Sequence, residues 1–162
     1  MLLIKDIYKA FGTQRVLAGV SIAIERGETV AVVGPSGTGK SVLLKIVTGL
    51  MSADSGDVSI FGESMTAAGS EKERERIRSR MGVLFQSAAL LDSLTLLDNV
   101  AFALRYRRSC SEREVYKRSM DLLARVGLSG KELALPGEVS IGMRKRVGLA
   151  RALVTNPEVV DR

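Results

Sequence analysis

The amino-acid sequence predicts an α/β fold, because a strand-like run, a glycine-rich loop and a helix-like run follow one another in its first third. Residues 29–33, Thr-Val-Ala-Val-Val, are β-branched and apolar, which is typical of a strand buried on both faces of a parallel sheet. Residues 34–41, Gly-Pro-Ser-Gly-Thr-Gly-Lys-Ser, match the pattern G-x-x-x-x-G-K-[ST] at every defined position. A helix is predicted from Lys40, since it carries Val42, Leu43, Ile46 and Val47 before Gly49.

The residues before this core predict an antiparallel β portion. Residues 2–8 and 20–24 are strand-like, the second with strict alternation, and a turn containing Gly12 separates them. After the core helix, a Ser-Gly turn leads into a short strand over residues 57–61, which Gly62 ends.

The next segment predicts an exposed helix followed by a buried strand. Residues 70–80 are almost all charged, with opposite signs three residues apart, which suits a solvated helix. No aromatic residue is interleaved to stack on a base, so a solvated face is favoured over a nucleic-acid contact. Residues 81–85 return to a buried strand that ends at Gln86, and ligand-binding residues favour that edge of an α/β sheet.

Residues 87–135 predict a mainly helical subdomain. Helix starts are predicted at Thr95-x-x-Asp98 and at Ser111-x-x-Glu114, and Gly127 ends the second helix. A last helix opens at Ser140 and stops at the Asn-Pro pair of residues 156–157.

Length and composition favour one domain in a reducing compartment. The 162 residues are 46% hydrophobic, enough for one sizeable core, and the net charge of +6 is compatible with nucleic acid, an anionic membrane surface or no specific partner. There is no apolar run of membrane-spanning length and no N-terminal leader, so we expect a cytoplasmic protein. Cys110 is the only cysteine, and histidine, the commonest general base, is absent.

The glycine-rich loop predicts a nucleotide-phosphate site. Its glycines let the backbone curl so that successive N–H groups point at phosphate oxygens, and the following helix adds its positive end. Lys40 would reach the β- and γ-phosphates of ATP, and the Ser41 hydroxyl would hold Mg²⁺. The predicted nucleotide-binding residues of this loop are Gly34, Pro35, Ser36, Gly37, Thr38, Gly39, Lys40 and Ser41.

With the phosphate-binding loop, Gln86 and the Ser140 helix in this order, the whole chain resembles the ATP-binding subunit of an ABC transporter. The resemblance implies that Phe11 stacks on adenine, although core packing by a single phenylalanine is the alternative. It also implies that Gln86 approaches Mg²⁺ and the attacking water, the alternative being a surface amide. Residues 85–102 and 142–153 look particularly like the ATPases of lipid-asymmetry, toluene-tolerance and mammalian-cell-entry importers.

The family signature is present in altered form. In ABC ATPases its serine and glycine amides contact the γ-phosphate held by the second subunit, and the matching residues here are Ser140, Gly142 and Met143. Ile141 stands where the family has its first glycine, and it adds bulk where a backbone must approach a phosphate. We therefore expect a weakened ATP-sandwiched dimer.

The C-terminal end departs further from the family pattern. The Asp-Glu pair that organises Mg²⁺ and polarises water would fall beyond Arg162, as would the switch histidine. Asp161 follows only two apolar residues, so it is not interpreted as the metal-organising aspartate. The sequence thus predicts a partial P-loop ABC ATPase core in a single, C-terminally truncated domain, 1–162. Its parts are residues 1–86, the helical subdomain 87–135, and 136–162 with the signature helix and the start of the metal-site strand.

The expected function is ATP and Mg²⁺ binding by a transporter subunit coupled to lipid transport across the cell envelope, with hydrolysis by this chain unlikely. The alternative is a non-catalytic nucleotide-binding or interaction module derived from an ABC ATPase. A nucleic-acid-processing ATPase would need a coiled-coil insertion or tandem halves, so no nucleic acid is expected. The resemblance implies a transmembrane permease and a second ATP-binding subunit, at the cytoplasmic face of the membrane.

Overall fold

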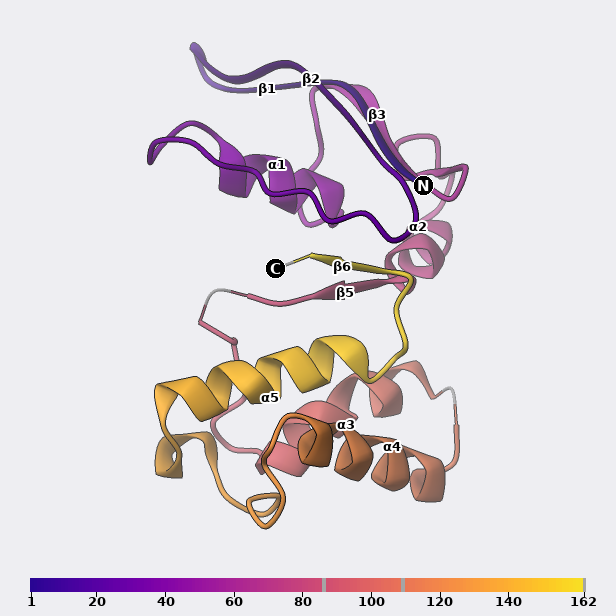
Figure 1. Cartoon of the computed structure of the whole chain (residues 1–162). Helices are drawn as coiled ribbons and strands as arrows, with labels where there is room; N and C mark the ends of the chain where they lie inside the picture. The colour runs from indigo at the N-terminus through magenta and orange to yellow at the C-terminus, as the bar shows by residue number, and fades with distance from the viewer. Residues whose placement is uncertain (86, 109, 162) are drawn as a thin grey trace. The chain divides into compact units, whose positions relative to one another are not determined.

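The computed structural model describes residues 1–85, 87–108 and 110–161 (Figure 1). Gln86, one of the predicted site residues, therefore lies outside the described residues. The chain divides into two compact units, Met1–Arg80 and Met81–Arg162. In the described ranges we find no helix that is both long and apolar enough to span a membrane.

The first unit is built on an antiparallel sheet. Its strands are β1 (Leu2–Phe11), β2 (Gln14–Ile24), β3 (Ser55–Ile60) and β4 (Glu63–Ser64), in the order β2-β1-β3-β4. β1 and β2 form a hairpin in which Leu2 pairs with Ile24 and Phe11 pairs with Gln14. The antiparallel N-terminal portion is confirmed, and both of its strands reach further toward the turn than the sequence pattern predicted.

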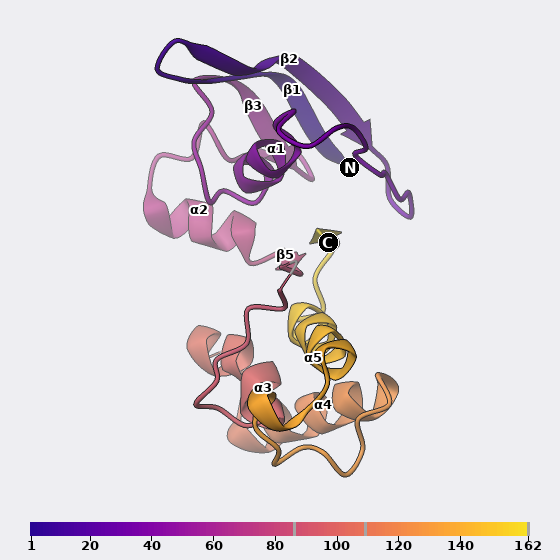
Figure 2. The same cartoon turned by 90° about the vertical axis from the view of Figure 1, so that its left-hand side faces the viewer.

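Two helices complete this unit. Helix α1 (Lys40–Val47) buries Leu43, Ile46 and Val47, and both views place it along one face of the sheet (Figure 1, Figure 2). Helix α2 (Glu71–Arg78) confirms the predicted charged helix. Only Ile77 is buried in α2, as its mostly charged sequence requires. Among the expected ion pairs between residues three apart, Arg74 Nη1 lies 3.6 Å from Glu71 Oε2.

The predicted buried strand over residues 29–33 is wrong. These residues adopt no strand and are exposed, with Val33 keeping 86% of its surface in contact with solvent. A parallel strand is held by hydrogen bonds from neighbouring strands, and its apolar run stabilises it only when other layers cover both faces. In the described part of this unit, the sheet pairs only β1 to β4 with one another. The segment therefore has no regular secondary structure and leads into the glycine-rich loop.

The second unit packs three helices under a short parallel strand pair. β5 (Met81–Val83) pairs with β6 (Val159–Asp161), and helices α3 (Leu96–Arg107), α4 (Glu112–Arg125) and α5 (Ile141–Leu153) share one core; a 3₁₀ turn, Pro136–Glu138, precedes α5. The three predicted N-caps are confirmed. Thr95, Ser111 and Ser140 each accept a hydrogen bond from the backbone three residues on.

Helix α5 also fixes the loop that follows β5. A Cβ at Gly148 would stand 2.9 Å from Ala88 Cβ, so the absence of a side chain permits this close approach. Farther along the helix, Arg151 donates from Nη2 to Ala88 O at 2.6 Å and from Nη1 to Ala89 O at 2.7 Å. Burial lowers the pKa of the Arg151 guanidinium from its usual value. The signature helix and this loop are thus joined by packing and by hydrogen bonds.

Candidate functional site

The glycine-rich loop, residues 34–41, is closed by its own side chains. Lys40 Nζ donates to Gly34 O at 2.8 Å and to Pro35 O at 2.6 Å, and Thr38 Oγ1 donates to Pro35 O at 2.9 Å. The Lys40 ammonium therefore lies beside the carbonyls at the start of the loop, where it brings a positive charge to an exposed turn.

The loop ends at the N-terminus of helix α1. Gly39 is the N-cap residue and makes no side-chain capping hydrogen bond, and the first turn of the helix contains no acidic residue. The backbone N–H groups of this turn consequently have no acceptor from the side chain of the N-cap residue, and the helix dipole adds a partial positive charge there. With the Lys40 ammonium beside them, these groups suit a bound phosphate chain.

Gly39 allows the loop to pack closely against the sheet. Its φ of +94° lies in the region that favours glycine, and a Cβ there would stand 2.8 Å from Val16 Cγ1 and 3.1 Å from Val16 O. Val16 and Leu17 belong to β2, and Leu17 pairs with Lys9 of β1. The phosphate-binding loop thus contacts the same hairpin that carries Phe11.

Phe11 lies at the end of β1, and 48% of its surface is exposed. Lys9 Nζ stands 5.7 Å from the centre of the Phe11 ring and 2.6 Å from Asp54 Oδ1. The second carboxylate oxygen of Asp54 accepts the Ala10 N–H at 2.7 Å. These bonds, first that from Lys9 and then that from Ala10, hold the pKa of Asp54 below its ordinary value.

The signature residues gather at the N-terminus of α5. Ser140 Oγ accepts the Met143 N–H at 3.2 Å, and the Met143 side chain packs against the helical core. Beside Gly142, the nearest atom to an added Cβ is Ser140 Oγ at 3.9 Å, so this backbone is open. Ile141 is the first residue of the helix and has 66% of its surface exposed.

The predicted site residues therefore form two groups. Phe11 and residues 34–41 share the first unit, and Ser140, Gly142 and Met143 lie together in the second. Sequence reasoning gave no sign of the Lys9–Asp54 pair beside Phe11, because its partners are 45 residues apart in the chain.

A magnesium ion would depend on the nucleotide for most of its ligands. Among residues 1–85, 87–108 and 110–161, no three His, Cys, Asp or Glu side chains are grouped to hold a metal. Mg²⁺ commonly keeps several waters and binds through substrate phosphates, so the Ser41 hydroxyl at the start of α1 suffices as a protein contact.

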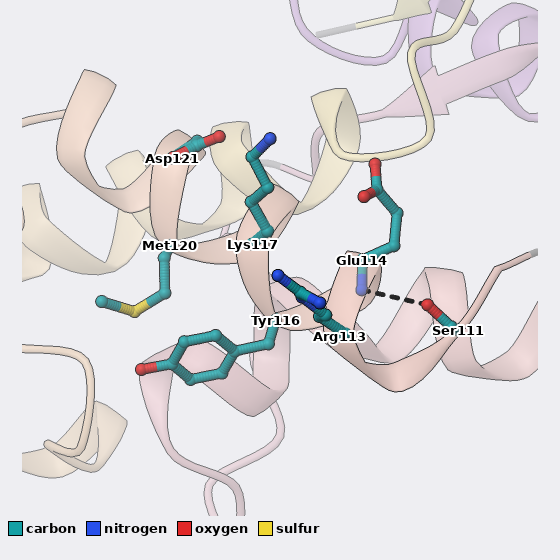
Figure 3. Close-up of a pocket in the computed structure, with 7 residues that line it drawn as sticks. All are labelled: Ser111, Arg113, Glu114, Tyr116, Lys117, Met120 and Asp121. Atoms are coloured by element: carbon teal, nitrogen blue, oxygen red, sulfur yellow. Dashed lines mark hydrogen bonds between the residues drawn. The ribbon is translucent and has the colours of Figure 1, made fainter.

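A depression on helix α4 was not foreseen from the sequence. It has a volume of about 560 Å³ and is open to solvent (Figure 3). Its two basic residues, Arg113 and Lys117, are matched by the acidic Glu114 and Asp121, with Tyr116 and Met120 beside them. One helix and its N-cap residue provide the whole lining of this depression. It is therefore a feature of the helix surface, and its mixed charges do not resemble a phosphate site.

Comparison with known sequences also indicates an ABC transporter protein. A sequence model described as ABC transporter matches residues 17–160. The chain is 47% identical over 159 residues to Protein TRIGALACTOSYLDIACYLGLYCEROL 3, chloroplastic, of Arabidopsis thaliana, covering 97% of this chain and 46% of that protein. It is 45% identical over 157 residues to the probable ribonucleotide transport ATP-binding protein mkl of Mycobacterium tuberculosis, covering 97% of this chain and 44% of that protein. The chain spans less than half the length of these curated relatives.

Solved structures share the fold. The ATP-binding cassette MJ0796, in a dimeric post-hydrolysis state bound to ADP and Pi, matches with a TM-score of 0.87 and 33% identity, over 99% of this chain and 72% of that one. The protein cbiO1 from Clostridium perfringens, part of the ABC transporter complex cbiONQ, matches with a TM-score of 0.85 and 26% identity, over 98% of this chain and 63% of that one. This chain belongs to the ABC transporter family, as part of its ATP-binding domain.

Proposed function

We propose that this chain binds Mg-ATP as the nucleotide-binding part of a transporter subunit. The observation that carries the proposal is the Lys40 ammonium placed within the glycine-rich loop, next to a helix N-terminus that has no side-chain cap. Phosphate oxygens would replace the carbonyls of Gly34 and Pro35 as acceptors for Lys40. Bonds from the ammonium to phosphate oxygens join two opposite charges, so they are stronger than the ammonium-to-carbonyl bonds that they displace.

Each remaining site residue has a proposed role. The backbone of residues 34–41 cradles the triphosphate, Ser41 contacts Mg²⁺, and the exposed ring of Phe11 stacks on the adenine. Gln86 is proposed to approach the metal and the attacking water. Ser140, Gly142 and Met143 are proposed to face the nucleotide of a second ATP-binding subunit.

We propose that this chain binds ATP but does not hydrolyse it on its own. Phosphoryl transfer to water needs an oriented nucleophile as well as a neutralised phosphate. None of the residues assigned to the site carries a carboxylate, so the phosphate contacts are supplied without a carboxylate to polarise the water that Gln86 is proposed to approach.

For the complete transporter we propose lipid as the cargo. The support is the likeness of residues 85–102 and 142–153 to lipid-handling importers, together with the relative named after trigalactosyldiacylglycerol. Other relatives are named for ribonucleotide transport and for methionine import. A permease and a second ATP-binding subunit are the proposed partners, on the cytoplasmic face of the membrane.

Ligand-dependent thermal stabilisation tests the proposal, with phosphate release measured in the same samples. Mg-ATP at about 100 times its Kd would stabilise the chain by about 2.7 kcal/mol. Lys40→Ala should abolish this shift, and Lys45→Ala, a change at another lysine of α1, should retain it. Equal shifts in both variants would contradict the phosphate site.

The alternative of a non-catalytic interaction module is favoured by Ile141, which places a bulky side chain at the start of the signature helix. Phosphate release separates the two candidates. Turnover that disappears in Lys40→Ala would identify an ATPase, and binding with no turnover on adding the permease partner would identify the module.

A further inference from the structure

The ring of Phe11 stands beside a lysine that is itself fixed. Lys9 and Phe11 are two residues apart on β1, so their side chains leave the same face of the strand. The Lys9 side chain is only 16% exposed, which is unusual for a lysine at a strand end. Its ammonium lies 5.7 Å from the ring centre, within the range of a cation–π contact.

Asp54 fixes that ammonium from the side. One carboxylate oxygen pairs with Lys9 Nζ at 2.6 Å and the other accepts the Ala10 N–H at 2.7 Å. The Asp54 N–H donates to Tyr8 O at 2.9 Å, so the turn before β3 is tied to β1 at the same point. Two bonds therefore hold the Asp54 carboxylate and a third holds its backbone, so the lysine that pairs with the carboxylate is restricted in turn.

The same hairpin contacts the phosphate-binding loop. Lys9 pairs with Leu17 across the hairpin, and an added Cβ at Gly39 would stand 3.0 Å from Leu17 Cδ2. The distance between the ring and the loop is thus set by rigid sheet pairing. A nucleotide whose phosphates occupy the loop would present its base toward this hairpin.

We infer that Lys9, held by Asp54, is a positioning residue for the nucleotide base. Its ammonium attracts one side of the Phe11 ring and restricts its rotation, while nearly half of the residue's surface stays available to a purine. An ordered ring loses less conformational freedom when a base stacks on it. The inference rests on the proposed function and deepens it, because it assigns part of the preference for a base to Lys9.

Calorimetric titration of the whole chain with Mg-ATP and with Mg-tripolyphosphate tests this assignment, since tripolyphosphate carries the phosphates without a base. Lys9→Met should weaken ATP binding by about two- to five-fold, the value of one exposed cation–π contact. It should leave tripolyphosphate binding unchanged, which also shows that the loop remains folded. Lys9→Arg should restore ATP binding, and Phe11→Ala should remove the effect of Lys9→Met.

Lys5→Met is the matched control, because Lys5 is an exposed lysine of the same strand. The inference is overturned if Lys9→Met weakens both ligands equally, if it weakens neither, or if Lys5→Met acts in the same way. Failure of the unaltered chain to bind tripolyphosphate would instead overturn the proposed phosphate site, and the inference with it.

Discussion

Asn99 bonds both backbone groups of Leu91. Asn99 Oδ1 accepts the Leu91 N–H at 2.8 Å, and Asn99 Nδ2 donates to Leu91 O at 3.0 Å. The same amide nitrogen lies 3.1 Å from Leu94 O and 3.0 Å from Thr95 O. Asn99 is fully buried in α3, so one side chain bonds backbone groups of three residues, Leu91, Leu94 and Thr95, in and next to the turn that precedes its helix.

Replacing Asn99 with Ala should destabilise the helical unit strongly. The change removes a fully buried side chain together with its partly buried hydrogen bonds to Leu91, and each buried polar group left unpaired costs about 1–3 kcal/mol. We expect a loss of about 2–4 kcal/mol in the free energy of unfolding, measured by urea denaturation of the whole chain. Asp92→Ala, in the same turn but exposed, should change stability by less than about 0.5 kcal/mol. Similar losses in the two variants would contradict the role of Asn99.

Substitutions at two glycines of the phosphate-binding loop should distinguish the cost of an unfavourable backbone conformation from the cost of a steric clash. Gly37 and Gly39 have φ of +84° and +94°, but an added Cβ meets nothing within 4 Å at Gly37 and meets Val16 at Gly39. Gly37→Ala should cost about 1–2 kcal/mol, the penalty for an L-residue in this region. Gly39→Ala should cost about 1 kcal/mol or more beyond that, because Val16 and Leu17 of β2 must shift to admit the added Cβ.

Chemical denaturation measures both losses, and tripolyphosphate affinity measures their effect on the site. Gly39→Ala should reduce affinity more than Gly37→Ala does, since it displaces the residue next to Lys40. The packing argument fails if Gly37→Ala proves the more harmful change.

The pH dependence of stability should include a contribution from Asp98. Arg105, and then the Thr95 hydroxyl, hold the pKa of the Asp98 carboxyl below its ordinary value of about 3.9. A depressed pKa in the folded state adds stability above about pH 4, and this stability is lost as the pH falls through the folded pKa. Asp98→Asn should therefore lower stability at pH 7 and reduce its loss between about pH 5 and pH 2.

The effect should be small, below about 1 kcal/mol at pH 7, because both side chains of the Asp98–Arg105 pair are more than a third exposed. Thermal unfolding across this pH range provides the measurement. Asp121→Asn on α4 controls for the change in net charge. If the two variants follow the same curve, Asp98 does not contribute as argued.

The features that the sequence predicted well depend on local chemistry. The caps at Thr95, Ser111 and Ser140 need only a hydroxyl and a backbone N–H three residues away. The loop from Gly34 to Ser41 is likewise continuous in the chain, so its pattern specified the turn and the helix that follows.

The features that it missed depend on distant residues. Residues 29–33 have the composition of a buried strand, but a strand forms only when others pair with it, and composition does not supply the pairing. Asp54 reaches Lys9 and Ala10 because β3 returns beside β1, which no local pattern encodes. The environment of Phe11 could therefore be described only from the folded chain.

Restoring glycine at position 141 should strengthen ATP-dependent self-association. Ile141 is the exposed first residue of α5, where a helix tolerates glycine with little loss of stability. Its side chain stands between Ser140 and Gly142, beside the backbone proposed to meet a phosphate on a second subunit. We expect Ile141→Gly to tighten the Mg-ATP-dependent dimer by roughly three- to ten-fold, about 0.7–1.4 kcal/mol.

Sedimentation with and without Mg-ATP measures the dimerisation. Leu133→Gly, which removes an exposed apolar side chain elsewhere in the unit, should leave the dimer unchanged. Equal dimerisation by the unaltered chain and by Ile141→Gly would mean that the isoleucine does not obstruct the contact.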